Sequence, residues 1–173
     1  MIVVLIGYMG AGKSTIGSTL AEVLGYNFID LDAYIAIKEK NSISNLFKSK
    51  GEIYFRRKET QYLKAIIENS DHTVLALGGG TPCYGNNFEL LQRFCKVKTI
   101  YLKLSISLLT ERLFTERHKR PLISHIQSKE DLLEFIGKHI FERVQYYSKA
   151  QITLDINHKP KQEVLELLVS KLV

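Results

Sequence analysis

Short apolar runs alternate with longer amphipathic stretches along this chain. Each run is separated from the next by sequence compatible with a helix, and strands that alternate with helices in this way usually pair in parallel. The pattern therefore predicts an α/β fold built on a parallel sheet. The expected strands are Ile2 to Ile6, Asn27 to Leu31, Thr73 to Leu77, Thr99 to Leu104 and Gln151 to Asp155.

The same periodicity indicates helices near both ends of the chain. After Pro160, apolar residues recur at every fourth position, which predicts a terminal amphipathic helix without a catalytic role. After the first expected strand, four apolar side chains are expected to share one buried helix face. They are Ile16, Leu20, Val23 and Leu24.

Length and composition are those of one globular domain. The chain has 173 residues, of which 45% are hydrophobic and 24% charged, and one hydrophobic core commonly serves ~100 to 200 residues. Residues 1–173 are therefore expected to form a single domain. No apolar run approaches the ~18 residues that cross a bilayer, and no leader pattern precedes the first strand. Cys83 and Cys95 show neither metal-ligand nor redox spacing, so we expect reduced thiols in a cytoplasmic protein that binds no membrane.

The chain is basic, with a formal net charge of +6 and an isoelectric point near 9.2. Such a charge suits either nucleic-acid binding or a pocket for anionic small molecules. No nucleic-acid-binding signature occurs, Trp is absent, and the aromatic residues do not alternate with basic stripes. We therefore favour the pocket and expect no nucleic-acid partner.

A complete phosphate-binding motif follows the first expected strand and opens the first expected helix. Residues Gly7 to Ser14 read G-x-x-x-x-G-K-[ST], the sequence of a P-loop. Its glycines let backbone N–H groups face phosphate oxygens, and the following helix adds its positive end. Lys13 is expected to be catalytic by reaching the β- and γ-phosphates, and Ser14 to ligate the Mg²⁺ that bridges them. The residues expected to bind ATP here are Gly10, Ala11, Gly12, Lys13, Ser14 and Thr15.

Two other interpretations of this motif are weaker. A glycine-rich turn could simply connect a strand to a helix, but every fixed position of the P-loop motif is matched. A GTPase would carry a guanine-binding Asn-Lys-x-Asp segment, and the sequence contains none. ATP is therefore the expected nucleotide.

Two carboxylates stand at the end of the second expected strand. Asp30 and Asp32 are two residues apart, so an extended backbone would place both on one face near the carboxyl edge of the sheet, where ligands bind. We expect Asp30 to hold Mg²⁺ through water and Asp32 to orient or deprotonate the acceptor hydroxyl. The competing interpretation is that one of them caps a helix beginning near Ala33.

The segment Gly51 to Glu59 looks helical and carries a candidate anion site. Arg56 and Glu59 are three residues apart on one helix surface, so the carboxylate can hold the guanidinium in place. Arginine grips a carboxylate through two parallel hydrogen bonds, which favours an acidic acceptor over a neutral sugar. Taken alone, an exposed ion pair on a solvated helix would explain the same residues.

Three consecutive glycines, Gly78, Gly79 and Gly80, follow the third expected strand. Such a run costs backbone entropy in any regular element. We therefore expect a substrate ring or a phosphate to approach this backbone closely. A plain flexible turn is the alternative.

Further cations lie in the second half of the chain. The polar, basic stretch Thr115 to Lys119 precedes Arg120 and is expected to be a mobile loop. Closed over the phosphates, it would exclude water, and Arg120 would stabilise the charge of the migrating phosphoryl group. Arg112, just before this stretch, is placed to stack on adenine. Arg143, four residues before Tyr147 on an expected helix, is a second candidate cation for the acceptor carboxylate.

Together these features resemble the shikimate kinase family in order and spacing, over nearly the whole chain. The phosphate motif alone is common to many NTPases, whereas the other motifs in series are far more discriminating. Two positions depart from the family pattern: Thr81-Pro82 follows the glycines where small or aliphatic residues are more frequent, and Ala150 stands three rather than four positions after Tyr147. The motifs that carry the resemblance are Gly7 to Ser14, Asp30-x-Asp32, Gly51-Glu52-x-x-Phe55-Arg56-x-x-Glu59, Gly78-Gly79-Gly80 and Arg120-Pro121-Leu122.

The resemblance implies a three-layer αβα P-loop kinase fold with a five-stranded parallel sheet. It implies a lid at about residues 112–125 and an acceptor-binding helical region at about residues 33–61. The implied reaction converts ATP and shikimate into ADP and shikimate 3-phosphate in aromatic amino-acid biosynthesis. Separately from the resemblance, we expect Mg²⁺ as the cofactor and a monomeric protein. Shikimate would be held by Asp32, Arg56, Arg143 and the glycines Gly78, Gly79 and Gly80, while Arg112, Arg120 and Asn157 would lie near ATP.

Two other functions stay open on the sequence alone. A gluconate-type or nucleoside monophosphate kinase would carry the same phosphate motif, lid and carboxylates. An ATP-binding switch without small-molecule turnover belongs to a different class. Its ADP release would stay slow and independent of any acceptor.

Overall fold

The computed structural model describes residues 1–172 and contains a five-stranded sheet whose strands all run parallel. The strand order is β2-β3-β1-β4-β5, so the sheet extends from β1 in both directions. Ligands of such sheets bind beyond the carboxyl ends of the strands where the order changes direction, which here is at β1. The strands are β1 (Ile2–Ile6), β2 (Asn27–Asp30), β3 (Thr73–Ala76), β4 (Val97–Lys103) and β5 (Ile152–Asp155).

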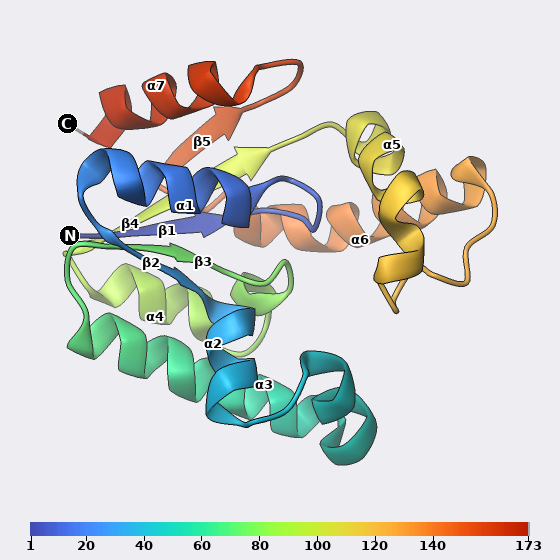
Figure 1. The fold of residues 1–173 in the computed structure, drawn as a ribbon, viewed down its shortest axis with the longest axis horizontal. Helices are drawn as coiled ribbons and strands as arrows, with labels where there is room; N and C mark the ends of the chain where they lie inside the picture. Colours follow the sequence, from blue (N-terminus) through green and yellow to red (C-terminus); the bar gives the residue numbers. More distant parts are fainter. Residues whose placement is uncertain (173) are drawn as a thin grey trace.

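Helices cover both faces of this sheet, which confirms the expected αβα architecture. α1 and α7 pack together on one face, and α3 and α4 lie on the other (Figure 1). α6 packs against α5 and against the short turn η1. The helices are α1 (Lys13–Leu24), α2 (Leu31–Lys38), α3 (Ile43–Asn69), η1 (Thr81–Cys83), α4 (Asn87–Arg93), α5 (Ile106–Glu116), η2 (Arg117–Lys119), α6 (Lys129–Tyr147) and α7 (Lys161–Leu172).

The core is centred on β1 and β3, which are buried at every position, as the strands of a parallel sheet covered on both faces must be. The expected buried face of α1 is correct at Ile16 and Leu20 but wrong at Val23, which is 58% exposed. A Cβ on Gly17 would stand 2.7 Å from the Phe28 ring. Because Gly17 has no side chain, α1 can turn that flank toward the sheet, and Ala21 is buried in place of Val23.

Two other expectations about local structure are corrected. β2 ends at Asp30 because α2 begins at Leu31. The stretch Thr115 to Lys119 is not an irregular loop, since α5 runs to Glu116 and η2 follows directly. Arg117 Nη1 donates a 2.7 Å hydrogen bond to the carbonyl oxygen of Phe114, which helps to hold this backbone in a helical path.

Two helical regions project beyond the carboxyl ends of the strands (Figure 1). One consists of α2 and the first part of α3, and the other of α5, η2 and the start of α6. α3 is kinked at Gly51, where φ is 81° and ψ is 169°. The segment Gly51 to Glu59 lies in α3 as expected, and only its first residue, Gly51, departs from helical geometry. Among the helices of residues 1–172, none combines the length and the hydropathy needed to cross a bilayer.

Candidate active site

The phosphate loop joins β1 to α1 and is built mainly from backbone groups. Gly12 caps α1 with a φ of 86°, a left-handed conformation that glycine adopts without strain. Lys13 is 9% exposed, and its Nζ donates 2.9 Å hydrogen bonds to the carbonyl oxygens of Gly7 and Tyr8. These bonds hold the ammonium group over the loop, at the N-terminal end of a helix where phosphates bind.

The buried position of Lys13 has an electrostatic consequence. Desolvation lowers the pKa of Lys13 to about 8, although Asp32 and Asp30 act to raise it. Arg120 and Arg143 lower this pKa further. A desolvated ammonium group is stabilised by added negative charge, so the loop favours an anionic ligand.

A cavity of about 520 Å³ opens over the phosphate loop. Met9, Leu77, Thr115 and Glu116, to which the sequence gave no individual binding role, are part of its wall. Most of the expected site residues line the same cavity, which brings together segments far apart in the sequence. They are Gly10, Gly12, Lys13, Ser14, Thr15, Asp30, Asp32, Gly78, Gly79, Arg112 and Arg120.

A smaller cavity of about 230 Å³ lies next to the first and shares Gly12, Thr15 and Arg112 with it. Asn157 lines neither cavity, because its Oδ1 accepts a 2.8 Å hydrogen bond from the Ser105 N–H. The Asn157 side chain therefore fixes the link between β4 and α5. The remaining lining residues are Ala11, Ile16, Ile156, Lys159, Lys161 and Val164.

Asp30 has two contacts, one on each carboxylate oxygen. Its Oδ1 accepts a 3.2 Å hydrogen bond from the Ala33 N–H, so Asp30 is the N-cap of α2, as the competing interpretation held. Its Oδ2 accepts a 2.5 Å hydrogen bond from Ser14 Oγ. Within the described residues no three His, Cys, Asp or Glu side chains form a metal-binding group. Two adjacent oxygen ligands fit Mg²⁺, which usually takes one or two protein oxygens and completes its shell with water and phosphate.

Asp32 is not on a strand, so the expected alternation of two strand side chains is wrong. It lies in the first turn of α2, and it still lines the same cavity as Asp30 because α2 starts where β2 ends. Desolvation raises the pKa of Asp32 to about 6, Asp30 and Glu59 raise it further, and Lys13 and Arg56 lower it. A carboxylate with this pKa can accept a proton near neutral pH.

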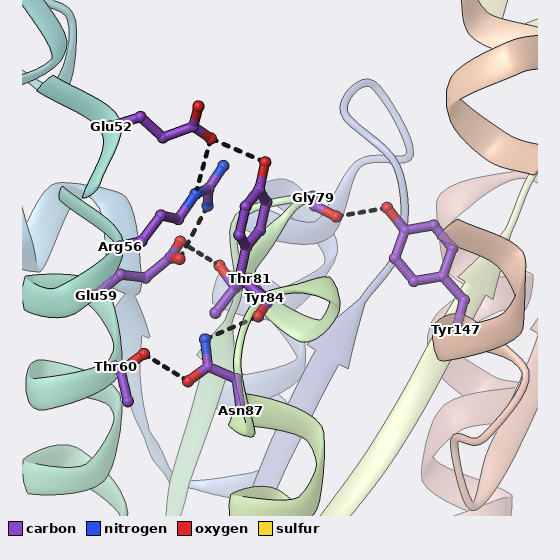
Figure 2. Close-up of polar contacts among 9 residues, drawn as sticks. All are labelled: Glu52, Arg56, Glu59, Thr60, Gly79, Thr81, Tyr84, Asn87 and Tyr147. Atoms are coloured by element: carbon purple, nitrogen blue, oxygen red, sulfur yellow. Dashed lines mark hydrogen bonds and ion pairs between the residues drawn. The ribbon is translucent and has the colours of Figure 1, made fainter. Parts of the chain in front are cut away.

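Arg56 is held by two carboxylates of its own helix (Figure 2). Its Nη1 donates to Glu59 Oε2 at 2.9 Å, and its Nε donates to Glu52 Oε1 at 3.4 Å. The side chain of Arg56 is 19% exposed and that of Glu59 is 1% exposed. The pair is therefore not the exposed ion pair of a solvated helix.

Each of the three glycines lies against a charged side chain of the site. A Cβ on Gly78 would stand 3.1 Å from Asp32 Oδ1, and one on Gly80 would stand 3.0 Å from Arg56 Nη2. A Cβ on Gly79 would stand 3.6 Å from Arg143 Nη1. Protein groups therefore approach all three glycines closely, whereas the expected approach of a substrate ring or a phosphate stays a prediction. Arg56, Gly80 and Arg143 do not line the cavity but lie beyond its Gly78–Gly79 end.

α6 contributes a cation and a hydrogen bond to this end of the cavity. Arg143 lies with its guanidinium carbon 5.6 Å from the centre of the Tyr8 ring. One turn later, the hydroxyl of the fully buried Tyr147 donates a 2.5 Å hydrogen bond to the carbonyl oxygen of Gly79 (Figure 2). The two residues share one helix, as expected, and Tyr147 fixes the backbone that Arg143 approaches.

Two arginines of the other helical region face the phosphate loop. Arg120 Nη2 donates to Glu116 Oε2 at 3.1 Å, while its buried Nε has no hydrogen-bond partner among residues 1–172. A buried donor left unpaired costs about 1 to 3 kcal/mol, which an anionic ligand would recover. Arg112 Nη1 donates to the Gly10 carbonyl oxygen at 3.3 Å and so connects α5 to the phosphate loop.

Sequence reasoning assigned no role to several side chains that support this site. Thr81 was noted only as a departure from a family pattern, and Glu52 only as part of a motif. Tyr84 was not singled out. The Thr81 hydroxyl donates to Glu59 Oε1 at 2.6 Å, across 22 positions of sequence. No spacing rule connects residues so far apart, so only the position of Thr81 beside the glycines could have drawn attention to it.

Comparison with known proteins gives one consistent result. A family model described as shikimate kinase matches residues 9–173. The shikimate kinase of Flavobacterium johnsoniae is 42% identical to this chain over 164 residues, which cover 95% of this chain and 94% of that protein.

Two solved structures extend the similarity to three dimensions. The shikimate kinase of Bacteroides thetaiotaomicron has a TM-score of 0.90 and 31% identity, covering 99% of this chain and 98% of that one. The shikimate kinase of Acinetobacter baumannii, solved in complex with shikimate, has a TM-score of 0.85 and 30% identity, covering 99% of this chain and 92% of that one. The similarity therefore spans both projecting helical regions as well as the sheet.

Proposed function

This chain belongs to the shikimate kinase family, and we propose that it phosphorylates shikimate with ATP through the residues gathered between the phosphate loop and Arg56. The reaction is the ATP-dependent phosphorylation of shikimate, a step of aromatic amino-acid biosynthesis. The observation that carries the assignment is the position of Asp32. Asp32 lines the cavity together with Lys13 of the phosphate loop, and its carboxylate lies against Gly78, at the end of the cavity beyond which Arg56 lies. In this proposal the carboxylate stands between ATP and the acceptor.

The ATP side is assigned as follows. The amides of the phosphate loop and Lys13 bind the β- and γ-phosphates. Ser14 would hold Mg²⁺ directly, and Asp30 would hold it through water. When bound, Mg²⁺ offsets negative charge on the phosphates. The smaller cavity receives adenine beside Arg112, and Asn157 supports its edge through the link between β4 and α5. The segment of about residues 112–125 acts as a lid, and its Arg120 supplies charge to the transferred group.

The acceptor side is assigned to residues beyond the Gly78–Gly79 end of the cavity. Arg56 and Arg143 bind the carboxylate of shikimate, because both guanidinium groups approach the glycine backbone from opposite helices. Gly78, Gly79 and Gly80 leave room for the ring. The region of about residues 33–61 then forms the acceptor-binding part of the domain.

The chemistry needs one proton transfer and one phosphoryl transfer. Asp32 accepts the proton of the 3-hydroxyl group, whose oxygen attacks the γ-phosphorus as the bond to the β-phosphate oxygen breaks. ADP leaves with that oxygen, and shikimate 3-phosphate is formed. Lys13 and Arg120 stabilise the charge that spreads over the transferred group.

A side-by-side assay tests this function. ADP release is measured with Mg²⁺ and ATP in the presence of shikimate, gluconate, AMP or no acceptor. We expect rapid release with shikimate only. Release that is faster with gluconate or AMP would favour another small-molecule kinase, and release that is slow and indifferent to all acceptors would favour an ATP-binding switch.

We further propose that the protein acts as a monomer in the cytoplasm. The support for the cytoplasm is that Cys83 and Cys95 are free thiols. Sedimentation with and without both substrates would measure the oligomeric state. Activity that depends on protein concentration would contradict the monomer.

A further inference from the structure

The turn after the three glycines contacts α3 through two side chains, Thr81 and Tyr84, which meet two glutamates of that helix. Thr81 is the first residue of η1, and Tyr84 is its C-cap, three residues later. On α3, Glu52 and Glu59 flank Arg56 at helical spacing. Thr81 contacts Glu59 and Tyr84 contacts Glu52, so the two faces meet with Arg56 between them (Figure 2).

The inner contact is buried. Thr81 is 0% exposed and Glu59 is 1% exposed, and the Thr81 hydroxyl donates to one carboxylate oxygen while Arg56 Nη1 donates to the other. A carboxylate bound at both oxygens keeps its orientation. Thr81 is itself fixed, because Asn87 Nδ2 donates to its carbonyl oxygen at 2.9 Å and Asn87 Oδ1 accepts a 2.8 Å bond from the Thr60 hydroxyl (Figure 2).

The outer contact is nearer to solvent. The Tyr84 ring centre lies 3.8 Å from Arg56 Cζ, a distance at which the ring face attracts the cation. The Tyr84 hydroxyl donates to Glu52 Oε1 at 2.8 Å, the oxygen that also accepts from Arg56 Nε. Tyr84 is 37% exposed, so water weakens this contact relative to the inner one.

We propose that Thr81 and Tyr84 are positioning residues for the acceptor carboxylate. Acting through Glu59 and Glu52, they fix the Arg56 guanidinium at Nη1 and at Nε, and the Tyr84 ring covers one face of the guanidinium. Arg56 Nη2 is left to meet the ligand beside Gly80. The proposal rests on the assignment of Arg56 to shikimate binding in the proposed function. In this proposal the turn after the glycines contributes to acceptor recognition indirectly, through Arg56, without contacting the ligand.

The test compares variants of both contacts by steady-state kinetics. Thr81→Val leaves a buried carboxylate oxygen unpaired, so we expect the KM for shikimate to rise roughly tenfold or more. Thr81→Ser keeps the hydroxyl and should return the KM to within about twofold of the original. Tyr84→Leu removes the ring and should raise the KM about three- to tenfold, and Tyr84→Phe removes only the hydroxyl and should raise it about twofold.

A matched control separates positioning from general disturbance. Tyr26 meets the His72 ring edge to face at the amino ends of β2 and β3, far along the sheet from the site, so Tyr26→Leu and Tyr26→Phe should leave both KM values unchanged. The KM for ATP should stay constant in every Thr81 and Tyr84 variant. Equal rises in both KM values, or failure of Thr81→Ser to rescue, would overturn the proposal.

Arg56→Ala, measured alongside, distinguishes this inference from the proposed function. If Arg56→Ala leaves the KM for shikimate unchanged, the acceptor site itself is wrongly assigned. If Arg56→Ala raises that KM while the Thr81 and Tyr84 variants do not, only their positioning role is wrong. If Thr81→Val melts below the assay temperature, Tyr84→Leu becomes the deciding variant, because Tyr84 is partly exposed and its replacement disturbs the core less.

Discussion

The two ends of the cavity are constructed differently. The phosphate end is a contiguous segment, Gly7 to Ser14, whose backbone groups and single lysine make the site. The acceptor end consists of side chains from α2, α3, η1 and α6, which are far apart in the sequence and joined by hydrogen bonds between elements. The phosphate end is therefore fixed by local sequence, whereas the acceptor end depends on how four elements pack.

This difference leads to distinct expectations for substitutions at each end. Changes at the phosphate end should affect ATP and turnover together, since the loop both binds the triphosphate and stabilises its reaction. Changes at the acceptor end should affect shikimate and leave ATP alone. Asp32, between the two, should affect turnover more than the binding of either ligand.

Asp32→Asn should have the largest effect. Loss of a general base typically costs about 10²- to 10⁴-fold in rate, and we expect kcat to fall within that range while both KM values change little. With Asp32 present, kcat/KM should fall as the pH drops below about 6, where this carboxylate becomes protonated. The checks are kcat and its pH profile, and an unaffected rate would remove Asp32 from the chemistry.

Lys13→Met should follow. Loss of one preorganised charge at the transferred group costs about 10²- to 10³-fold in kcat, and the affinity for ATP should fall as well. The KM for shikimate should stay nearly constant. A variant with normal ATP affinity and reduced shikimate affinity would contradict the division between the two ends.

Arg56→Ala should weaken shikimate binding by about 1.5 to 3 kcal/mol, the usual contribution of a hydrogen bond to a charged group. This corresponds to roughly ten- to hundredfold or more in affinity. Titration calorimetry with each ligand separately would measure it. Arg56 would cease to be an acceptor contact if ATP and shikimate lost affinity equally.

The pH dependence of ATP affinity should be the smallest effect. Lys13 has a pKa of about 8 in the free protein, and triphosphate binding favours its charged form, so binding above pH 8 must take up a proton. The Kd for ATP should therefore rise roughly five- to tenfold between pH 7 and pH 9. Calorimetry in buffers of different ionisation enthalpy would detect the proton, and Lys13→Met should abolish its uptake.

The fold and the phosphate end were largely predictable because their signals are local. Alternation of apolar runs located all five strands to within two residues at each end. Lys13 and Ser14, which the P-loop motif singled out, both line the cavity. The errors at this level also have local causes. Val23 is exposed because Gly17 allows α1 to rotate, which no periodicity shows.

The acceptor end was predictable only in part. Arg56 and Glu59 lie one turn apart on a helix, so their pairing followed from spacing. Asp32 was placed on a strand, although it lies in the first turn of a helix whose cap is Asp30. The bond between Tyr147 and Gly79 spans 68 positions, and contacts of that kind depend on tertiary packing.

The carboxylate of Asp32 is expected to have opposite effects on the stability of the folded chain and on turnover. Its pKa is raised from 3.8 to about 6 in the folded chain, so the folded state binds this proton more tightly than the unfolded state does. The resulting contribution to the free energy of unfolding is present below pH 4 and is lost as the pH rises through 6. Above that pH the charged form is on the order of 3 kcal/mol less favourable in the folded state than in the unfolded state. At pH 7.5 and without ligands, Asp32→Asn should therefore melt at a higher temperature than the parent chain. The carboxylate proposed to drive turnover would then make the ligand-free protein less resistant to heat.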